Sequence, residues 1–213
     1  MNHAEATPIV REAWVKVHKR EPSTLETLYT QAIASLETGY GRIGQFGNLA
    51  AQGKYNWGGL QKPVSTDGTC PEGFALGQDQ GKVCFFVFPT DADAAAHMIK
   101  QLTQSKLRPN MIEAMAGSAE DVATAMRGTD LGKDPSLNHT AWYEGIRGTT
   151  EAERIAYYAT AIRNSAKSIG TALEAKGRQL LAEVPPSNAG VGLIALGVLG
   201  SVIYMGRKMK WTL

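Results

Sequence analysis

The chain has 213 residues, 22 Lys and Arg against 20 Asp and Glu, and a net charge of +2. This length allows one domain of ordinary size plus an appendage, and the apolar and charged fractions are those of a globular protein. The small net charge gives no reason to expect nucleic acid as a partner, although it is compatible with an anionic polymer. The four histidines have no ligand spacing, and no phosphate or dinucleotide motif is present, so we expect neither a metal nor a cofactor.

The first predicted helix opens with Thr7 as its cap and Pro8 at its first position. One side of this helix is apolar and the other is basic, and the basic side is most simply a solvated face. The apolar side carries Ile9, Val10, Ala13, Trp14 and Val17.

The second predicted helix starts at Ser23, which forms a capping-box pattern with Glu26. It ends at Gly39 and Gly41, because glycine tolerates the backbone angles of a helix exit. Helical spacing predicts one apolar stripe, made of Leu25, Leu28, Tyr29, Ala32, Ile33 and Leu36.

Glu37 lies at the edge of this stripe, four residues after Ile33, in the last helical turn. Partial burial and the negative end of the helix dipole both disfavour a carboxylate, so we expect a raised pKa for Glu37. A carboxylic acid that keeps its proton near neutral pH is what glycoside cleavage needs as a general acid. Taken alone, however, a Glu near a helix end is ordinarily a solvated surface residue.

The stretch 39–62 is rich in Gly, Asn and aromatic residues and reads as a loop with short strands. The clearest strand is Lys82–Phe88, which Pro89 ends. Cys70 and Cys84 are the two cysteines, and their spacing suits neither a redox pair nor a zinc site. They are candidates for a disulfide, and two buried free thiols are the alternative.

Helical patterns return after this strand. The caps Thr90, Ser118 and Thr150 each precede an acidic residue three positions later, and Asn110 can open a short helix between the first two. A polar stretch, 128–149, separates the last two helices. The final helix is long and stops before Pro185-Pro186.

The C-terminal stretch Gly190–Gly206 carries no charge. With the residues before it, it covers about 20 residues or about 30 Å as a helix, enough to cross a bilayer core. A basic and aromatic cluster follows at once: Arg207, Lys208, Lys210 and Trp211. We therefore predict a 184–187 linker, a transmembrane helix at 188–206 and a basic tail at 207–213, with the tail cytoplasmic and residues 1–183 outside. The alternative is a soluble protein whose last helix packs on the domain.

Two motifs carry the candidate chemistry: Glu37-Thr38-Gly39-Tyr40-Gly41 and Asn56-Trp57-Gly58-Gly59-Leu60-Gln61. The second offers amide and aromatic groups beside bare backbone, as sugar-binding surfaces do. Together, in this order and spacing, the motifs resemble the lysozyme-like superfamily, in particular bacterial and phage peptidoglycan hydrolases of the glucosaminidase and lytic transglycosylase type. In those families a helix ends in a catalytic Glu, and a related Asn-Trp-Gly or Gly-Leu-Met-Gln segment follows.

The resemblance covers about residues 5–183 and implies a mainly α-helical lysozyme-like domain with a small β excursion. It implies cleavage of β-1,4 bonds between MurNAc and GlcNAc, with Glu37 as general acid. Tyr143, or after it Tyr157, would face that acid. Tyr40, Asn56, Trp57, Gln61 and Tyr157 would hold the sugar.

The chain departs from the family pattern in two ways. Its second motif lacks the Met of the transglycosylase segment, and no second catalytic carboxylate is evident among Asp67, Glu72 and Asp79, which read as surface acids. Hydrolysis and lytic transglycosylation therefore stay open. The expected partners are peptidoglycan strands and a lipid bilayer, with a homo-oligomer or a phage virion assembly as further settings. The rival interpretation is a non-catalytic glycan-binding or structural membrane protein on the same scaffold.

Overall fold

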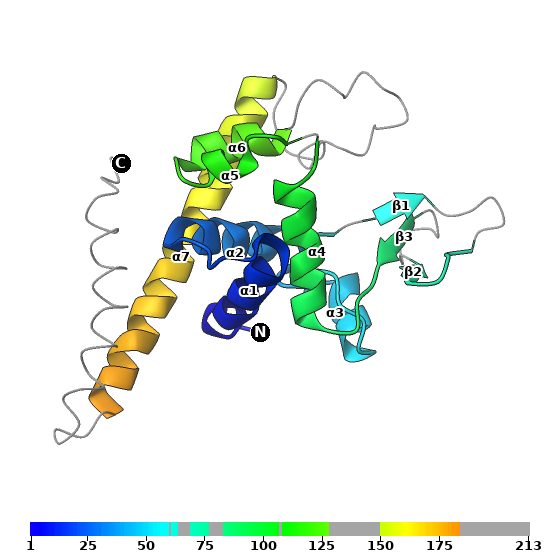
Figure 1. Cartoon of the computed structure of the whole chain (residues 1–213), viewed down its shortest axis with the longest axis horizontal. Coiled ribbons are helices and arrows are strands. Elements are labelled where there is room, and N and C mark those ends of the chain that lie inside the picture. Colours follow the sequence, from blue (N-terminus) through cyan, green and yellow to red (C-terminus); the bar gives the residue numbers. More distant parts are fainter. Residues whose placement is uncertain (60, 64–68, 77–82, 107, 128–149, 184–213) are drawn as a thin grey trace.

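The protein is mainly α-helical, with a small sheet, in the computed structural model (Figure 1). The structure describes residues 1–59, 61–63, 69–76, 83–106, 108–127 and 150–183. Its helices are α1 (His3–His18), α2 (Thr24–Thr38), α3 (Gln45–Ala51), α4 (Asp91–Thr103), α5 (Met111–Ala114), α6 (Ala119–Arg127) and α7 (Glu151–Glu183). The strands are β1 (Gln61–Pro63), β2 (Phe74–Leu76) and β3 (Val83–Phe86). The predicted mainly α domain with a small β excursion is confirmed at this level.

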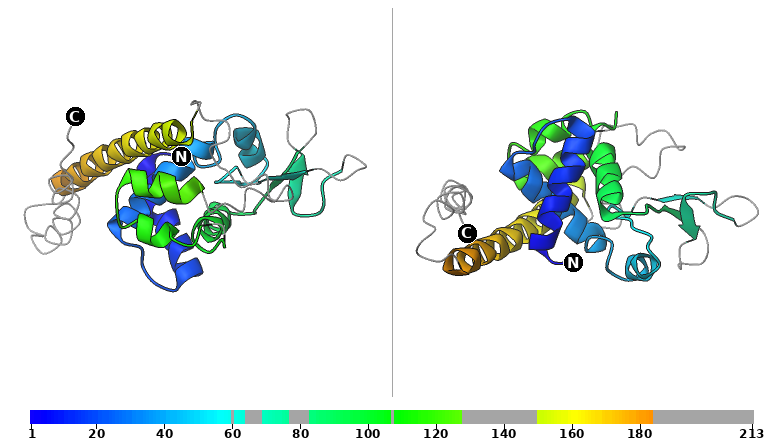
Figure 2. Two further views of the ribbon diagram at one scale, coloured as in Figure 1. Left: turned by 90° about the horizontal axis from the view of Figure 1, so that it is seen from above. Right: turned by 60° about the horizontal axis from the view of Figure 1, so that its bottom comes forward.

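The helices form one body, and the sheet projects from one side of it (Figures 1 and 2). Helix α2 packs against both α1 and α7, while α4 packs on α1 and α6 packs on α7. The last turns of α7 extend beyond the other helices in every view. Because α2 packs on two helices, its end lies within the helical body, and the chain continues from there through α3 to the sheet. The largest buried side chains of the body include Trp14, Ile33, Met98, Leu102, Met126 and Ile162.

Helix α1 starts earlier than the sequence predicts. Asn2 and Glu5 form a reciprocal capping box, so the helix begins at His3 and Pro8 lies inside it. The prediction that Thr7 caps this helix was wrong, because the Thr7 hydroxyl instead donates to the His3 carbonyl one turn back. Pro8 is tolerated because its position costs the helix only one backbone hydrogen bond near its start.

Helix α2 has the predicted ends. The Ser23 hydroxyl accepts from the Glu26 amide at 3.1 Å, and the Glu26 carboxylate accepts from the Ser23 amide. Gly39 ends the helix in a left-handed conformation, with φ of 55°. The predicted stripe is buried in the middle of the helix and partly buried at its start, but Leu36 is 39% exposed at its end. Burial of the apolar face therefore ends near Ile33, about one turn before the end of the helix.

The later helices also begin at their predicted caps. Thr90 accepts from the Asp93 amide, Ser118 from the Asp121 amide, and Thr150 from the Glu153 amide. Asn110 precedes the one-turn helix α5, as expected. Local capping patterns alone were thus enough to place the starts of α2, α4, α6 and α7.

The sheet is antiparallel, with strand order β1-β3-β2. Its central strand β3 falls within the predicted Lys82–Phe88. Phe85 on β3 meets the ring of Phe46 on α3, with centroids 5.0 Å apart, and Phe86 lies 5.0 Å from the ring of His97 on α4. These aromatic contacts attach the sheet to the two helices beside it.

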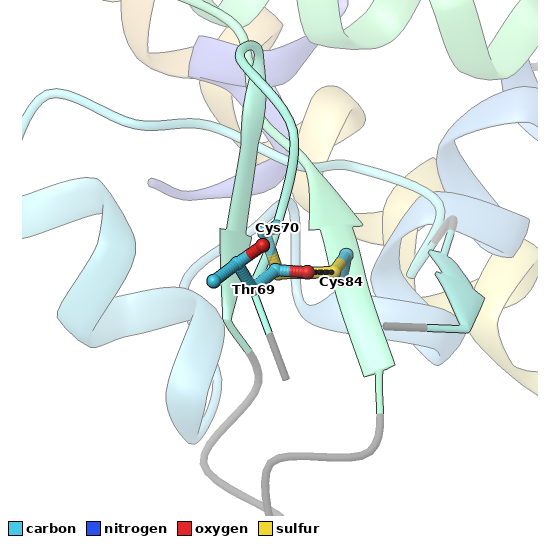
Figure 3. Close-up of a disulfide and its surroundings, with 3 residues drawn as sticks. All are labelled: Thr69, Cys70 and Cys84. Atoms are coloured by element: carbon cyan, nitrogen blue, oxygen red, sulfur yellow. Dashed lines mark hydrogen bonds between the residues drawn. A yellow bond between two sulfur atoms is a disulfide. The ribbon is translucent and has the colours of Figure 1, made fainter. Parts of the chain in front are cut away.

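Cys70 and Cys84 form a disulfide, which decides between the two alternatives left open by the sequence (Figure 3). Cys84 is fully buried on the central strand, and the carbonyl oxygen of Thr69 lies 3.8 Å from its sulfur. The bond ties the segment before β2 directly to β3.

The predicted linker, transmembrane helix and basic tail (184–213) lie outside the described residues. Within the residues that are described, no helix has the length and apolar character needed to cross a bilayer.

Replacing both cysteines by alanine is expected to lower the free energy of unfolding by about 3 kcal/mol, because the bond closes a loop of about 15 residues in the unfolded chain. Denaturant unfolding, followed with and without a reductant, measures this change. Reductant should destabilise the wild type and leave the Cys70→Ala/Cys84→Ala chain unaffected. Equal unfolding midpoints for all four samples would contradict the prediction.

Candidate functional site

Glu37 is half-buried in the last turn of α2. Its Oε1 accepts a hydrogen bond from the hydroxyl of Tyr158, which lies on α7 and is only 5% exposed. Helix packing between α2 and α7 brings these residues together across 121 positions of sequence. The contact fixes one oxygen of the carboxyl group.

The pKa of Glu37 is raised, as the sequence predicts, and burial is the largest cause. The Tyr158 hydrogen bond and the positive charge of Arg108 act in the opposite direction and lower it. Burial outweighs both effects. A carboxylate loses more favourable hydration when it is buried than it regains from one hydrogen bond and one nearby positive charge. Glu37 therefore keeps its proton to a higher pH than an exposed glutamate does.

Arg108 is the second group acting on Glu37. It lies in the connection between α4 and α5 and is 5% exposed. Its Nε donates to the Met126 carbonyl at 3.2 Å, and a terminal nitrogen donates to the Gln101 carbonyl at 3.4 Å. Burial lowers the pKa of Arg108, while Tyr158 and Glu37 raise it. Arg108 is thus held by two backbone carbonyls and acts on Glu37 and Tyr158 through its charge.

The chain leaves α2 through a left-handed turn. Gly39, Tyr40 and Gly41 have φ of 55°, 59° and 69° in succession. A Cβ added to Gly41 would lie 2.8 Å from the carbonyl oxygen of Asn56. Glycine is needed at position 41 both for this conformation and for the close approach of backbone to backbone.

Thr38 joins the two sequence motifs. Its hydroxyl accepts from the Gly41 amide at 2.8 Å and donates to the Trp57 carbonyl at 2.7 Å. The Tyr40 and Trp57 rings lie 5.3 Å apart between centroids. The motifs around Glu37 and Asn56 are therefore in direct contact, as a common site requires.

Asn56 and Trp57, which the sequence favoured for sugar contact, are both buried. Asn56 is 2% exposed and its amide donates to the Phe86 carbonyl at 3.0 Å. Trp57 is fully buried and its Nε1 donates to Asp91 at 2.7 Å. Asp91 also accepts from Arg42 at 2.7 Å. Their side chains are engaged within the protein, and this burial argues against a direct contact with a sugar.

The other predicted site residues have different positions. Tyr40 is 3% exposed, and its hydroxyl lies 2.6 Å from Nδ1 of His3, so its ring is also not available to a sugar. Tyr157 is 52% exposed, next to Tyr158. Gln61 pairs with Phe85 through the backbone of β1. Tyr143 lies outside the described residues.

Tyr158 and Arg108 are the site residues that sequence reasoning missed. Tyr158 lies in the core on α7, next to Tyr157, which the sequence favoured after Tyr143 for facing Glu37. A buried tyrosine needs a partner for its hydroxyl, which is the signal that could have identified it. Nothing in the local sequence marks Arg108 as buried.

Of the three acids considered as a second catalytic carboxylate, the structure describes one, Glu72, and it is not placed at the site. Glu72 is exposed beside β2. Asp67 and Asp79 lie outside the described residues. Of the acids considered for catalysis, the described part of the chain therefore offers Glu37 alone at this site.

Comparison of the chain with protein-family models, with curated proteins and with solved structures finds no match. The site is therefore interpreted from its own geometry.

Gly41→Ala is expected to destabilise the protein more than Gly53→Ala. Both glycines have positive φ, 69° and 72°, but nothing lies within 4 Å of a Cβ added at Gly53. The conformation should cost each variant about 1–2 kcal/mol, and the contact with Asn56 should cost Gly41→Ala about 1 kcal/mol or more in addition. Denaturant unfolding of both variants measures the difference, and equal losses would contradict the close approach.

The pH dependence of stability should differ between wild type and Glu37→Gln. Folded Glu37 holds its proton more tightly than unfolded Glu37, whose ordinary pKa is 4.5. Its stabilising contribution is thus complete below pH 4.5 and is lost as the pH rises through the folded pKa. Glutamine keeps an acceptor for Tyr158 and does not titrate.

Unfolding measured in urea from pH 4 to 8 should show wild type losing stability relative to Glu37→Gln as the pH rises. A difference between the two that stays constant with pH would show that Glu37 has an ordinary pKa in the folded protein.

Proposed function

We propose that this chain is a peptidoglycan glycosidase that cleaves β-1,4 bonds between MurNAc and GlcNAc, with Glu37 as its general acid. The observation that supports this most is the half-buried Glu37 carboxyl group, whose pKa is raised by burial and whose Oε1 is held by Tyr158. The left-handed turn and the Asn56-Trp57 segment beside it agree with the resemblance to lysozyme-like enzymes.

The proposed reaction begins with protonated Glu37. With Oε1 accepting from Tyr158, the acidic proton belongs on Oε2. It passes to the glycosidic oxygen as the bond from that oxygen to C1 breaks, so the departing sugar leaves as an alcohol. Positive charge develops at C1 and is met by the carbonyl oxygen of the substrate's own N-acetyl group, so no second enzyme carboxylate is required.

The Glu37 carboxylate then serves as base. It takes a proton from water in hydrolysis, or from the 6-hydroxyl of the muramyl residue in lytic transglycosylation, while the oxygen attacks C1. Glu37 is returned to its acid form in both reactions. Trp57 and Tyr40 are buried, so we assign the sugar contact to Tyr157, which is exposed and lies on α7 one residue before Tyr158, the partner of Glu37.

The same proposal includes the location. The uncharged 188–206 segment would anchor the enzyme as a single-pass membrane protein, with residues 1–183 facing the cell wall. Such an enzyme opens the wall beside a membrane, in a phage virion or a bacterial envelope.

Glu37→Gln is expected to reduce release of muropeptides from purified peptidoglycan by about 10²–10⁴-fold, the contribution of a general acid. The full chain is assayed with the same detergent in every sample. Glu72→Gln is the matched control, since it makes the same chemical change at an exposed acid and should keep wild-type activity.

Mass analysis of the released muropeptides identifies the reaction, because anhydro, reducing MurNAc and reducing GlcNAc ends belong to different cleavages. Equal activity in wild type and Glu37→Gln would remove Glu37 from the mechanism. A wild type that binds peptidoglycan without releasing fragments would favour the glycan-binding alternative.

A further inference from the structure

Tyr40 is a bulky residue in a backbone conformation that favours glycine. Its φ of 59° lies in the left-handed region, between Gly39 and Gly41, whose φ values are 55° and 69°. The two glycines adopt this conformation freely, whereas a residue with a Cβ adopts it at a cost in free energy. Such strain persists only where the surrounding structure holds it, and it is common at functional sites.

The side chain of Tyr40 makes the contacts that hold this conformation. Its ring is buried, and its centroid lies 5.3 Å from that of Trp57. Its hydroxyl lies 2.6 Å from Nδ1 of His3, within hydrogen-bonding distance, and the two rings meet edge to face with centroids 5.7 Å apart. The first turn of α1 is therefore bonded to the turn that follows α2, across 37 positions of sequence.

His3 is itself held in place on α2. The capping box of Asn2 and Glu5 makes His3 the first residue of α1. The His3 carbonyl accepts from the Thr7 hydroxyl at 3.0 Å, and the Thr7 hydroxyl accepts from the side-chain amide of Gln31 on α2 at 3.0 Å. The start of α1 is thus a fixed anchor for the turn.

The turn that Tyr40 anchors also closes the helical turn that carries Glu37. The Tyr40 amide donates to the Ala34 carbonyl, and the Gly39 amide donates to the Ser35 carbonyl, both at 3.1 Å. Rotation of the Tyr40 backbone toward an ordinary conformation would weaken these bonds. Glu37 would then move with the loosened end of the helix.

We propose that Tyr40 is a positioning residue: its hydroxyl, bonded to His3, clamps the strained turn after α2 and so holds the Glu37 carboxyl group where it donates its proton. A third glycine at position 40 would fit the backbone better, but it would provide no clamp. The inference gives Tyr40, whose ring is buried, a role other than the sugar contact predicted from the sequence. It rests on the proposed acid role of Glu37.

The test compares two sites that share the same backbone strain. Among the described residues other than glycine, Lys19 at the end of α1 also has a positive φ, of 57°. Tyr40→Gly and Lys19→Gly both relieve the strain, but the first also removes the clamp. Tyr40→Phe keeps the ring on Trp57 and removes the hydroxyl. His3→Ala removes the other half of the bond and leaves the capping box of α1 intact.

The first measurement is muropeptide release by the full chain. Tyr40→Phe and His3→Ala should each lose about tenfold in kcat, and Tyr40→Gly about 10²-fold, because a small misplacement of a catalytic group costs this much. KM should stay near the wild-type value, since no substrate contact is removed. The double variant Tyr40→Phe/His3→Ala should lose no more than either single variant, because both changes remove one bond. Lys19→Gly should keep the wild-type kcat.

The second measurement needs no turnover: the titration of the Glu37 carboxyl carbon by NMR, with the Glu37→Gln spectrum assigning the signal. Burial is the largest cause of the raised Glu37 pKa, so a carboxyl group released from its place should titrate closer to the ordinary pKa of 4.5. Tyr158 and Arg108, which also act on this pKa, are kept in every variant. We expect a lower Glu37 pKa in the Tyr40 and His3 variants and the wild-type value in Lys19→Gly.

A wild-type kcat and Glu37 pKa in Tyr40→Phe and His3→Ala would overturn the role of Tyr40, and so would equal losses in Lys19→Gly. A merely structural role would lower stability without moving the Glu37 pKa. If Tyr40→Gly does not fold, the two milder variants still decide. If the wild type releases no muropeptides, the glycosidase proposal fails, while the NMR titration still decides whether Tyr40 positions Glu37.

Discussion

The hydroxyl of Thr38 is the contact on which the arrangement of the site depends. It is buried, it accepts from the Gly41 amide, and it donates to the Trp57 carbonyl, so one side chain holds the end of α2, the left-handed turn and the following motif together. Because Thr38 is adjacent to Glu37, any shift of this contact moves the carboxyl group. The position of the acid is therefore set by backbone packing rather than by a flexible loop.

The electrostatics of Glu37 depend on a balance between opposing effects. Burial raises its pKa, and Tyr158 and Arg108 limit that rise. Either effect alone would give a poor general acid: burial without partners holds the proton too tightly, and strong pairing without burial leaves a permanent carboxylate. Because its pKa is raised in the folded protein, ionisation of Glu37 also destabilises the fold.

Much of this organisation could be predicted from local sequence. Capping patterns located α2, α4, α6 and α7 because they are complete within four residues. The raised pKa of Glu37 followed from its place on the helix. Tyr158 and Arg108 could not be found in the same way, since their roles arise from packing between elements more than 70 residues from Glu37 along the chain. The start of α1 was misplaced because Pro8 gave a stronger signal than the cap at Asn2.

Trp57 shows that the sequence of a motif does not by itself tell whether its aromatic ring is exposed. An exposed Asn-Trp-Gly segment would offer an aromatic face to a sugar, but here the indole is buried and bonds Asp91 at the start of α4. Arg42 reaches the same carboxylate from the other side of the turn, and its guanidinium lies 4.9 Å from the centroid of the Tyr55 ring. The motif thus links the turn after α2 to α4. Trp57 is held at its carbonyl by Thr38 and at its indole by Asp91, so this part of the loop is fixed to both α2 and α4.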